Sequence, residues 1–80
     1  MKNDYNEVCG AIVLLAKKLA ASNRVMSIEN LSRKFEGLHP YGGRGLIQAA
    51  YRYAHAQRDQ EAMNALTRVF TRDGLPVWYE

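Results

Sequence analysis

The side chains best suited to bind a charged partner are concentrated in residues 38–58 of this 80-residue chain. This segment holds three arginines, both histidines, three of the five tyrosines and no acidic residue. Arginine can contact phosphates or carboxylates, Gln and His can form adaptable hydrogen bonds, and Tyr can stack or bury apolar area. On a helix, six side chains share one arc opposite Leu46, Ala50 and Tyr53: Arg44, Gln48, Tyr51, Arg52, His55 and Arg58. We therefore predict a partner-binding face formed by Tyr41, Arg44, Gln48, Tyr51, Arg52, His55 and Arg58.

Other residues that could do chemistry lack the partners that catalysis or metal binding needs. The one cysteine, Cys9, lies beside the apolar stripe of the first expected helix, where a free thiol usually behaves as a small hydrophobic group. One Cys and two His, without the close spacings of a zinc site, predict no metal, and no cofactor motif is present. No paired carboxylates stand out in the loops. We expect a protein that is not an enzyme; an enzyme using His39 is a third hypothesis, and the base it needs cannot be identified.

Glycines cluster directly before the predicted face. Residues 37–45 (GLHPYGGRG) contain four of the six glycines and one of the two prolines, which predicts the main loop of the chain. The run Gly42-Gly43-Arg44-Gly45 could offer free amides and a guanidinium to a phosphate at a helix start. It lacks the spacing of a P-loop, and a flexible turn is the simpler interpretation.

Apolar periodicity predicts four helices in a single domain that covers residues 1–80. The expected helices are residues 5–22, 27–36, 44–58 and 60–72, with Ser27 and Asp59 as N-caps. Gly37 is expected to end the second helix and Asp73-Gly74 the fourth. The short break at Asp59 makes the last two helices an antiparallel αα-hairpin.

The apolar tail at residues 75–80 (LPVWYE) is expected to dock on the protein in an extended conformation, because Pro76 disfavours helix. Two alternatives are open for it. In one, Val77 and Trp78 close the core, with the tail paired to residues 24–27; in the other, Trp78 and Tyr79 anchor a partner. The expected fold is mainly α, a compact four-helix domain with at most a minor two-stranded β ribbon that involves the tail.

The amino-acid composition indicates the cellular compartment in which the protein is expected. One cysteine allows no disulfide within the chain, which favours a reducing compartment. The longest apolar run, residues 11–16, is far shorter than the roughly 20 residues that span a bilayer, so we expect a cytoplasmic protein without membrane contact. Leu14 points away from the apolar stripe of its helix and could contact a partner or a second copy, which leaves a homodimer open.

The net charge of +3 and the residues above favour binding over catalysis. The first hypothesis is a small interaction protein whose basic and aromatic helix face covers an acidic surface of a partner protein complex. By analogy of size, it would resemble the small phage and mobile-element proteins that inhibit host machinery, such as anti-CRISPR proteins.

The alternative is a dimeric helix-turn-helix-like transcriptional regulator that binds DNA with residues 27–36 and 44–58 as its two helices. The connection of about seven residues is longer than the usual three or four. A looser winged-helix-like variant is open, and its wing would come from the tail. Nucleic acid therefore stays open as a partner.

Overall fold

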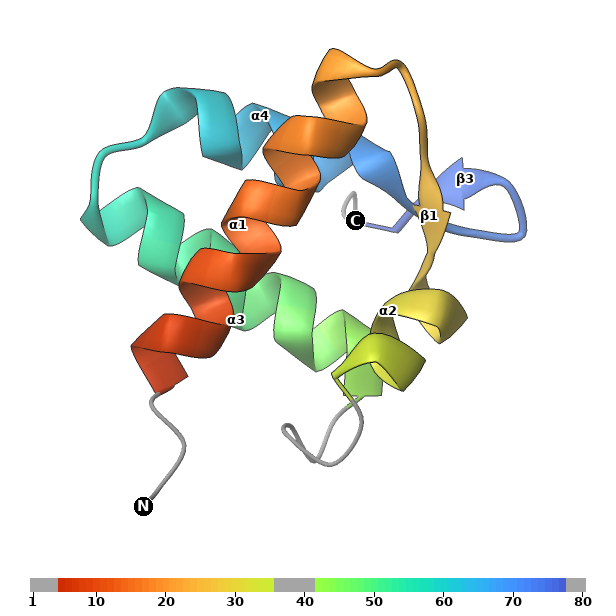
Figure 1. The fold of residues 1–80 in the computed structure, drawn as a ribbon, viewed down its shortest axis with the longest axis horizontal. Helices are drawn as coiled ribbons and strands as arrows, with labels where there is room; N and C mark the ends of the chain where they lie inside the picture. Colours follow the sequence, from red (N-terminus) through yellow and green to blue (C-terminus); the bar gives the residue numbers. More distant parts are fainter. Residues whose placement is uncertain (1–4, 36–41, 78–80) are drawn as a thin grey trace.

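The computed structural model describes residues 5–35 and 42–77. Within these residues the chain forms four helices: α1 (Tyr5–Ala21), α2 (Ile28–Lys34), α3 (Gly42–Ala56) and α4 (Gln60–Val69). Three short strands accompany them: β1 (Met26–Ser27), β2 (Phe70–Arg72) and β3 (Leu75–Pro76) (Figure 1). The mainly α, four-helix fold expected from the sequence is confirmed. The expected end of the second helix at Gly37 lies outside the described residues.

Helix α1 crosses the hairpin formed by α3 and α4, and the core lies where the three helices meet (Figure 1). Ile12 and Ala16 of α1 are fully buried there, and alanines on the facing helices let the backbones approach closely. Each buried Leu or Ile stabilises the fold by roughly 1.5–3 kcal/mol. Leu14 is 55% exposed on the opposite side of α1, as expected. The fully buried residues of α3 and α4 include Ile47, Ala50, Ala62, Leu66 and Val69.

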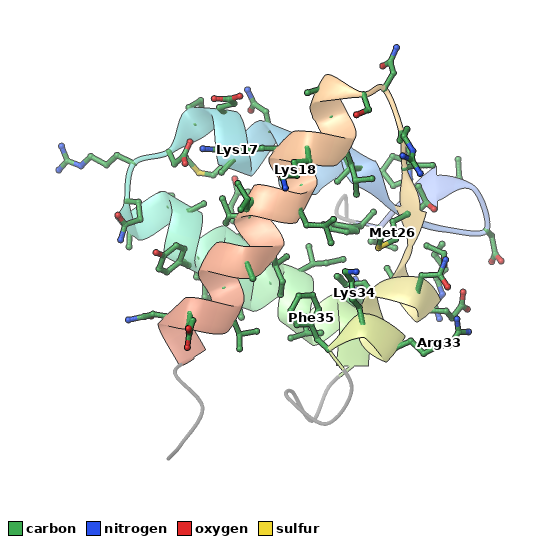
Figure 2. The ribbon with its side chains drawn as sticks, in the orientation of Figure 1. Lys17, Lys18, Met26, Arg33, Lys34 and Phe35 are labelled. Atoms are coloured by element: carbon green, nitrogen blue, oxygen red, sulfur yellow. The ribbon has the colours of Figure 1, made fainter. Side chains whose placement is uncertain are left out.

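Helix α2 begins as predicted, with Ser27 as its N-cap. The Ser27 hydroxyl accepts a hydrogen bond from the Asn30 backbone N–H at 3.2 Å and so satisfies an amide that has no partner within the helix. Met26 before it and Phe35 after it both pack against the core (Figure 2). The β1–α2 segment is therefore held at both ends by buried side chains.

The C-terminal segment differs from the expectation. Helix α4 ends at Val69 instead of residue 72, and Phe70–Arg72 continues as strand β2. This strand pairs in parallel with β1 and antiparallel with β3, so the sheet has three strands in the order β1-β2-β3. Met26–Ser27 and Leu75–Pro76 are thus both paired to β2 and not to each other. Phe70 is fully buried, and an apolar side chain at this position fits a helix stripe and a strand equally well.

Asp73 and Gly74 form the turn of the β2–β3 hairpin and do not end a helix. Their φ angles are 54° and 83°, and Arg72 lies opposite Leu75 across this two-residue turn. Asp-Gly is among the strongest short signals for such a turn, because both positions require positive φ. Beyond β3, the Val77 N–H donates to the Phe70 carbonyl at 3.1 Å, and Val77 packs against the core. Trp78 and Tyr79 lie outside the described residues.

Helix α3 begins at Gly42, two residues earlier than predicted, so residues 42 and 43 are helical and not part of a loop. The reason is the close contact between α3 and α2. A Cβ atom on Gly43 would lie only 2.5 Å from the Ile28 carbonyl oxygen. Glycine at this position therefore lets the two helices pack. The rest of the predicted loop, residues 37–41, lies outside the described residues.

A carboxylate at the α3–α4 turn connects α1 to the hairpin. Asp59 Oδ1 accepts from the Ala62 backbone N–H at 3.1 Å and caps α4, as predicted. Its Oδ2 lies 2.8 Å from Lys17 Nζ, and Figure 2 shows Lys17 extending from α1 toward the start of α4. The hydrogen bond from Lys17, followed by that from Ala62, lowers the pKa of Asp59. The same bond raises the pKa of Lys17.

Two glycine substitutions test the packing of the helices. Gly43→Ala should lower the free energy of unfolding by about 1–3 kcal/mol, because the new methyl group overlaps a backbone oxygen. Gly10→Ala is the matched control in α1, where the new Cβ meets Tyr53 Oη at an ordinary 3.7 Å. This variant should gain up to about 1 kcal/mol from helix propensity. Urea denaturation measures both, and equal stability of the two variants would contradict the close α2–α3 contact.

The ion pair predicts a pH dependence of stability. Asp59 has a lowered pKa in the folded protein, so its contribution is present at neutral pH and is lost as the pH falls below about 4. Asp59→Asn retains a good N-cap but cannot pair with Lys17. The melting temperature of this variant should therefore fall less between pH 6 and pH 3 than that of the wild type. Asp59→Ala loses the cap as well and should be less stable than Asp59→Asn at neutral pH. Parallel pH profiles for wild type and Asp59→Asn would disprove this role.

Candidate functional site

One side of helix α3 presents a row of polar side chains to solvent. Arg44, Gln48, Arg52 and His55 are all exposed and follow one another at helical spacing. With a rise of about 1.5 Å per residue, the row is about 16 Å long. The sequence of α3 contains no Asp or Glu, so no carboxylate of its own helix neutralises these cations. We call these four residues the α3 face.

The other three residues of the predicted face stand apart from this row. Tyr51 is half-buried and packs against the core, because its place on the helix wheel is nearer to the inward side than the sequence pattern suggested. Arg58 is exposed but lies beyond α3, in the turn to α4, with a φ of 56°. Tyr41 lies outside the described residues. The structure therefore brings four of the seven predicted residues together in one exposed row.

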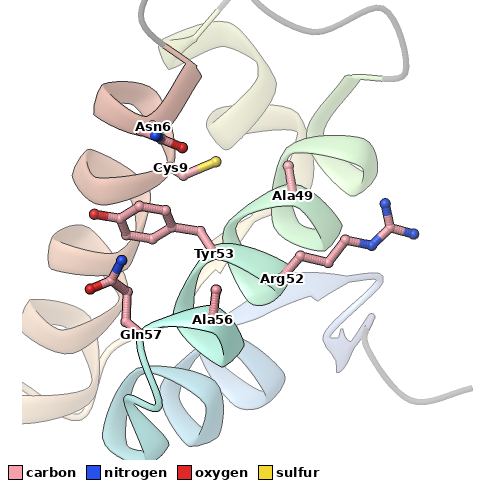
Figure 3. Close-up of a pocket in the computed structure, with 7 residues that line it drawn as sticks. All are labelled: Asn6, Cys9, Ala49, Arg52, Tyr53, Ala56 and Gln57. Carbon is pink, nitrogen blue, oxygen red and sulfur yellow. The ribbon is translucent and has the colours of Figure 1, made fainter.

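A pocket of about 370 Å³ opens between α1 and α3, beside the α3 face (Figure 3). Cys9 is 2% exposed and lines its buried part, and burial raises the pKa of the Cys9 thiol. The Tyr53 hydroxyl lies over Gly10, since a Cβ there would be 3.7 Å from it. Arg52 belongs to both the pocket and the α3 face. The lining residues are Asn6, Cys9, Ala49, Arg52, Tyr53, Ala56 and Gln57.

Sequence reasoning did not identify this pocket. Its walls come from residues 6–9 and residues 49–57, which are at least 40 positions apart along the chain, and only the packing of α1 against α3 brings Asn6 and Gln57 to one cavity. Tyr53, expected on the inward side of its helix, packs against the core and is half-buried, and it also lines the pocket. No local spacing signals such a site, because each helix contributes only a few ordinary side chains.

A second pocket, of about 270 Å³, lies between α1 and α4. Lys17, Arg68 and Glu61 line it together with Asn64 and three alanines. Its charges are mixed, and Lys17 is already paired with Asp59 at 2.8 Å. This pocket therefore offers a less uniform charge than the α3 face.

Further exposed cations lie on α1 and α2. Lys18, Arg33 and Lys34 are exposed, and Figure 2 shows Lys18 on the near side of α1 and Lys34 at the end of α2. Arg33 donates to the Asn30 side-chain oxygen at 2.8 Å. The segment that contains α2 also contains Glu29, so its positive charge is partly offset. Substitutions of these exposed cations can therefore serve as controls for substitutions on the α3 face.

The described residues show neither a metal-binding cluster nor a membrane-spanning helix. Residues 5–35 and 42–77 contain no cluster of three or more His, Cys, Asp or Glu side chains that could hold a metal ion. In the same ranges no helix has the length and apolar character that crossing a membrane requires. His39, the residue on which the enzyme hypothesis depends, lies outside them.

Exposure separates the residues of the α3 face from the core residues of α3. Tyr51→Ala should lower the free energy of unfolding by about 1–3 kcal/mol, because the ring packs against the core. The neighbouring Arg52→Ala should change it by less than about 0.5 kcal/mol, because that side chain is exposed. Thermal and urea denaturation measure both values. A large loss of stability for Arg52→Ala would mean that Arg52 has a structural role and is unsuitable as a binding probe.

No protein-family model matches the chain, and no curated protein or solved structure matches it either.

Proposed function

We propose that this protein is a non-catalytic interaction module whose α3 face binds an acidic surface of a partner protein. The observation that carries the proposal is the exposed row of Arg44, Gln48, Arg52 and His55 on a helix without a single carboxylate. Complementary charge speeds encounter and sets the orientation of binding. Hydrogen bonds from the Gln and His side chains then add specificity.

A protein partner is favoured by the kind of cation in the row. Arginine is enriched in protein–protein interfaces, whereas lysine is depleted, and α3 carries two exposed arginines and no lysine. Two arginines make few phosphate contacts, and affinity for nucleic acid depends on many. Arg58, exposed in the turn after α3, would extend the contact beyond the row.

Binding of this kind can act by occupying a site on a larger complex. That is how we propose the protein functions, by analogy with small phage and mobile-element inhibitors such as anti-CRISPR proteins. The support for this part is the small size of the chain and a binding face made of adjacent side chains on one rigid helix. An inhibitor of this type needs affinity for its target and a complementary shape, and it needs no catalytic residues.

DNA binding is a second candidate, favoured by the order of elements at the C-terminal half. Only residues 57–59 separate α3 from α4, and the β2–β3 hairpin follows α4 directly. A turn of three or four residues is typical of a helix-turn-helix, and the hairpin has the place of a wing. In that arrangement α4 would enter the groove, with Gln60, Asn64 and Arg68 in one exposed row. The reading helix would then be α4 and not α3, unlike the expectation from the sequence.

A pair of double variants tests the proposal. Arg44→Gln with Arg52→Gln should weaken binding of the purified partner about tenfold, because two cations of the interface are lost. Lys18→Gln with Lys34→Gln removes the same charge from exposed sites on α1 and α2 and should change the affinity less than twofold. Cross-linking and affinity capture from the source cells identify the partner, and isothermal titration calorimetry then gives the dissociation constants.

The outcome also separates the two candidate functions. An equal effect of both double variants, or no effect of either, would contradict an interface on the α3 face. DNA binding would instead be supported by a gel shift with random duplex DNA that weakens steeply between 50 and 200 mM salt. The Arg68→Ala variant should then reduce this shift.

A further inference from the structure

The outer side of helix α1 carries four exposed residues in one row: Glu7, Ala11, Leu14 and Lys18. Leu14 is 55% exposed although its side chain is large and apolar. The spacing of four, three and four residues keeps the row on one side of the helix, opposite the buried Ile12. Figure 2 shows Lys18 on the near side of α1, away from the hairpin that α1 crosses. We call these four residues the α1 stripe.

The two charges of the α1 stripe are not neutralised within residues 5–35 and 42–77. Neither Glu7 nor Lys18 forms an ion pair there, whereas the neighbouring Lys17 is paired with Asp59. On α1 itself, the positions three and four residues from each of these two charges hold no residue of opposite charge. The α1 stripe therefore has a negative end and a positive end, with its two apolar residues between them.

A second copy of α1, lying antiparallel to the first, matches this stripe residue by residue. Two copies related by a two-fold axis make reciprocal contacts, so that residue i faces residue j and residue j faces residue i. The midpoint between Glu7 and Lys18 along the chain is also the midpoint between Ala11 and Leu14. One register therefore sets Leu14 opposite Ala11 of the second copy and, at the same time, Glu7 opposite Lys18 of the second copy. By symmetry each contact occurs twice.

The apolar contact in this register joins a large side chain to a small one. Leu14 projects from one helix, and Ala11 of the second copy leaves the space that Leu14 fills, so the two backbones can approach closely. Contact removes the exposed apolar surface of Leu14 from water. With a rise of about 1.5 Å per residue, the stripe is about 17 Å long. An interface of this length is small, and small interfaces are typical of weak association.

We propose that the protein forms a weak antiparallel homodimer through the α1 stripe. Two Leu14 side chains occupy its centre, and Glu7–Lys18 ion pairs between the copies close both ends. A second copy is favoured over a different partner because the charges and the side-chain sizes of the stripe complement themselves under a two-fold rotation. This dimer leaves the α3 face free, since Arg52 points away from α1 (Figure 3). Each dimer would then offer two α3 faces to a partner.

Charge exchange tests the register of the dimer. Glu7→Lys and Lys18→Glu each place like charges opposite each other at both ends, and each should weaken dimerisation about fivefold or more at low ionic strength. An equimolar mixture of these two variants restores opposite charges at both ends and should form a heterodimer about as stable as the wild-type dimer. Sedimentation equilibrium measures the dissociation constants, and circular dichroism checks that each variant keeps its helices.

The apolar centre has a matched control. Leu14→Ala should weaken dimerisation about tenfold, because the central contact is lost. Leu75→Ala removes a leucine that is exposed to a similar degree, 67%, on β3 and should change dimerisation less than about twofold. For the wild type we expect a dissociation constant on the order of 0.1 mM, as suits a small interface.

Three outcomes would overturn the proposed dimer. The first is a wild type that stays monomeric at about 1 mM. The second is an equal effect of the two leucine variants, because a different surface would then be in use. The third is a mixture of Glu7→Lys and Lys18→Glu that does not form a dimer, because the register would then be wrong. None of these measurements uses the partner of the α3 face, so the proposed function stands or fails separately.

Discussion

The packing of α1 across the α3–α4 hairpin is the constraint on which the rest of this structure depends. A chain of 80 residues with one cysteine has no internal disulfide to stabilise it, so its stability has to come from a small, well-packed core. Ile12 and Ala16 of α1 meet Ala50, Ala62 and Leu66 of the hairpin, all fully buried. The small side chains bring the helices close together, and this close approach decides which surfaces are left to solvent.

The position of the proposed binding face follows from that packing. Helix α3 turns its apolar side toward α1, α2 and α4, and no other helix of residues 5–35 and 42–77 covers its polar side. The Lys17–Asp59 ion pair and the Asp59 cap hold the turn between α3 and α4 against α1. A rigid helix presents its side chains with little loss of conformational entropy on binding. The pocket forms along the same line of contact, where Ala49 and Ala56 leave space between α1 and α3.

Predictions from the sequence were accurate where the evidence was local. The caps at Ser27 and Asp59 are those predicted, because a capping side chain bonds to an amide three residues away. The sequence predictions were wrong where one residue pattern is compatible with two kinds of secondary structure. Phe70 suits both a helix stripe and a buried strand, and Gly42–Gly45 suits both a loop and a tightly packed helix start. Pairing with β1 places Phe70 in a strand, and the contact with Ile28 accompanies the helix start at Gly42. Both contacts join residues that are not close in the sequence.

The sequence by itself determined the helical class, the exposed position of Leu14, the burial of Cys9 and the row of Arg44, Gln48, Arg52 and His55. Periodicity suffices for these features because a helix repeats every 3.6 residues and sorts its own side chains into inner and outer sides. Only the tertiary structure decided that Tyr51 packs inward, that β2 joins β1 to β3, and that Asn6 shares a pocket with Gln57. These contacts join residues far apart in the chain, and the free energy that selects them comes from packing that no short stretch of sequence contains.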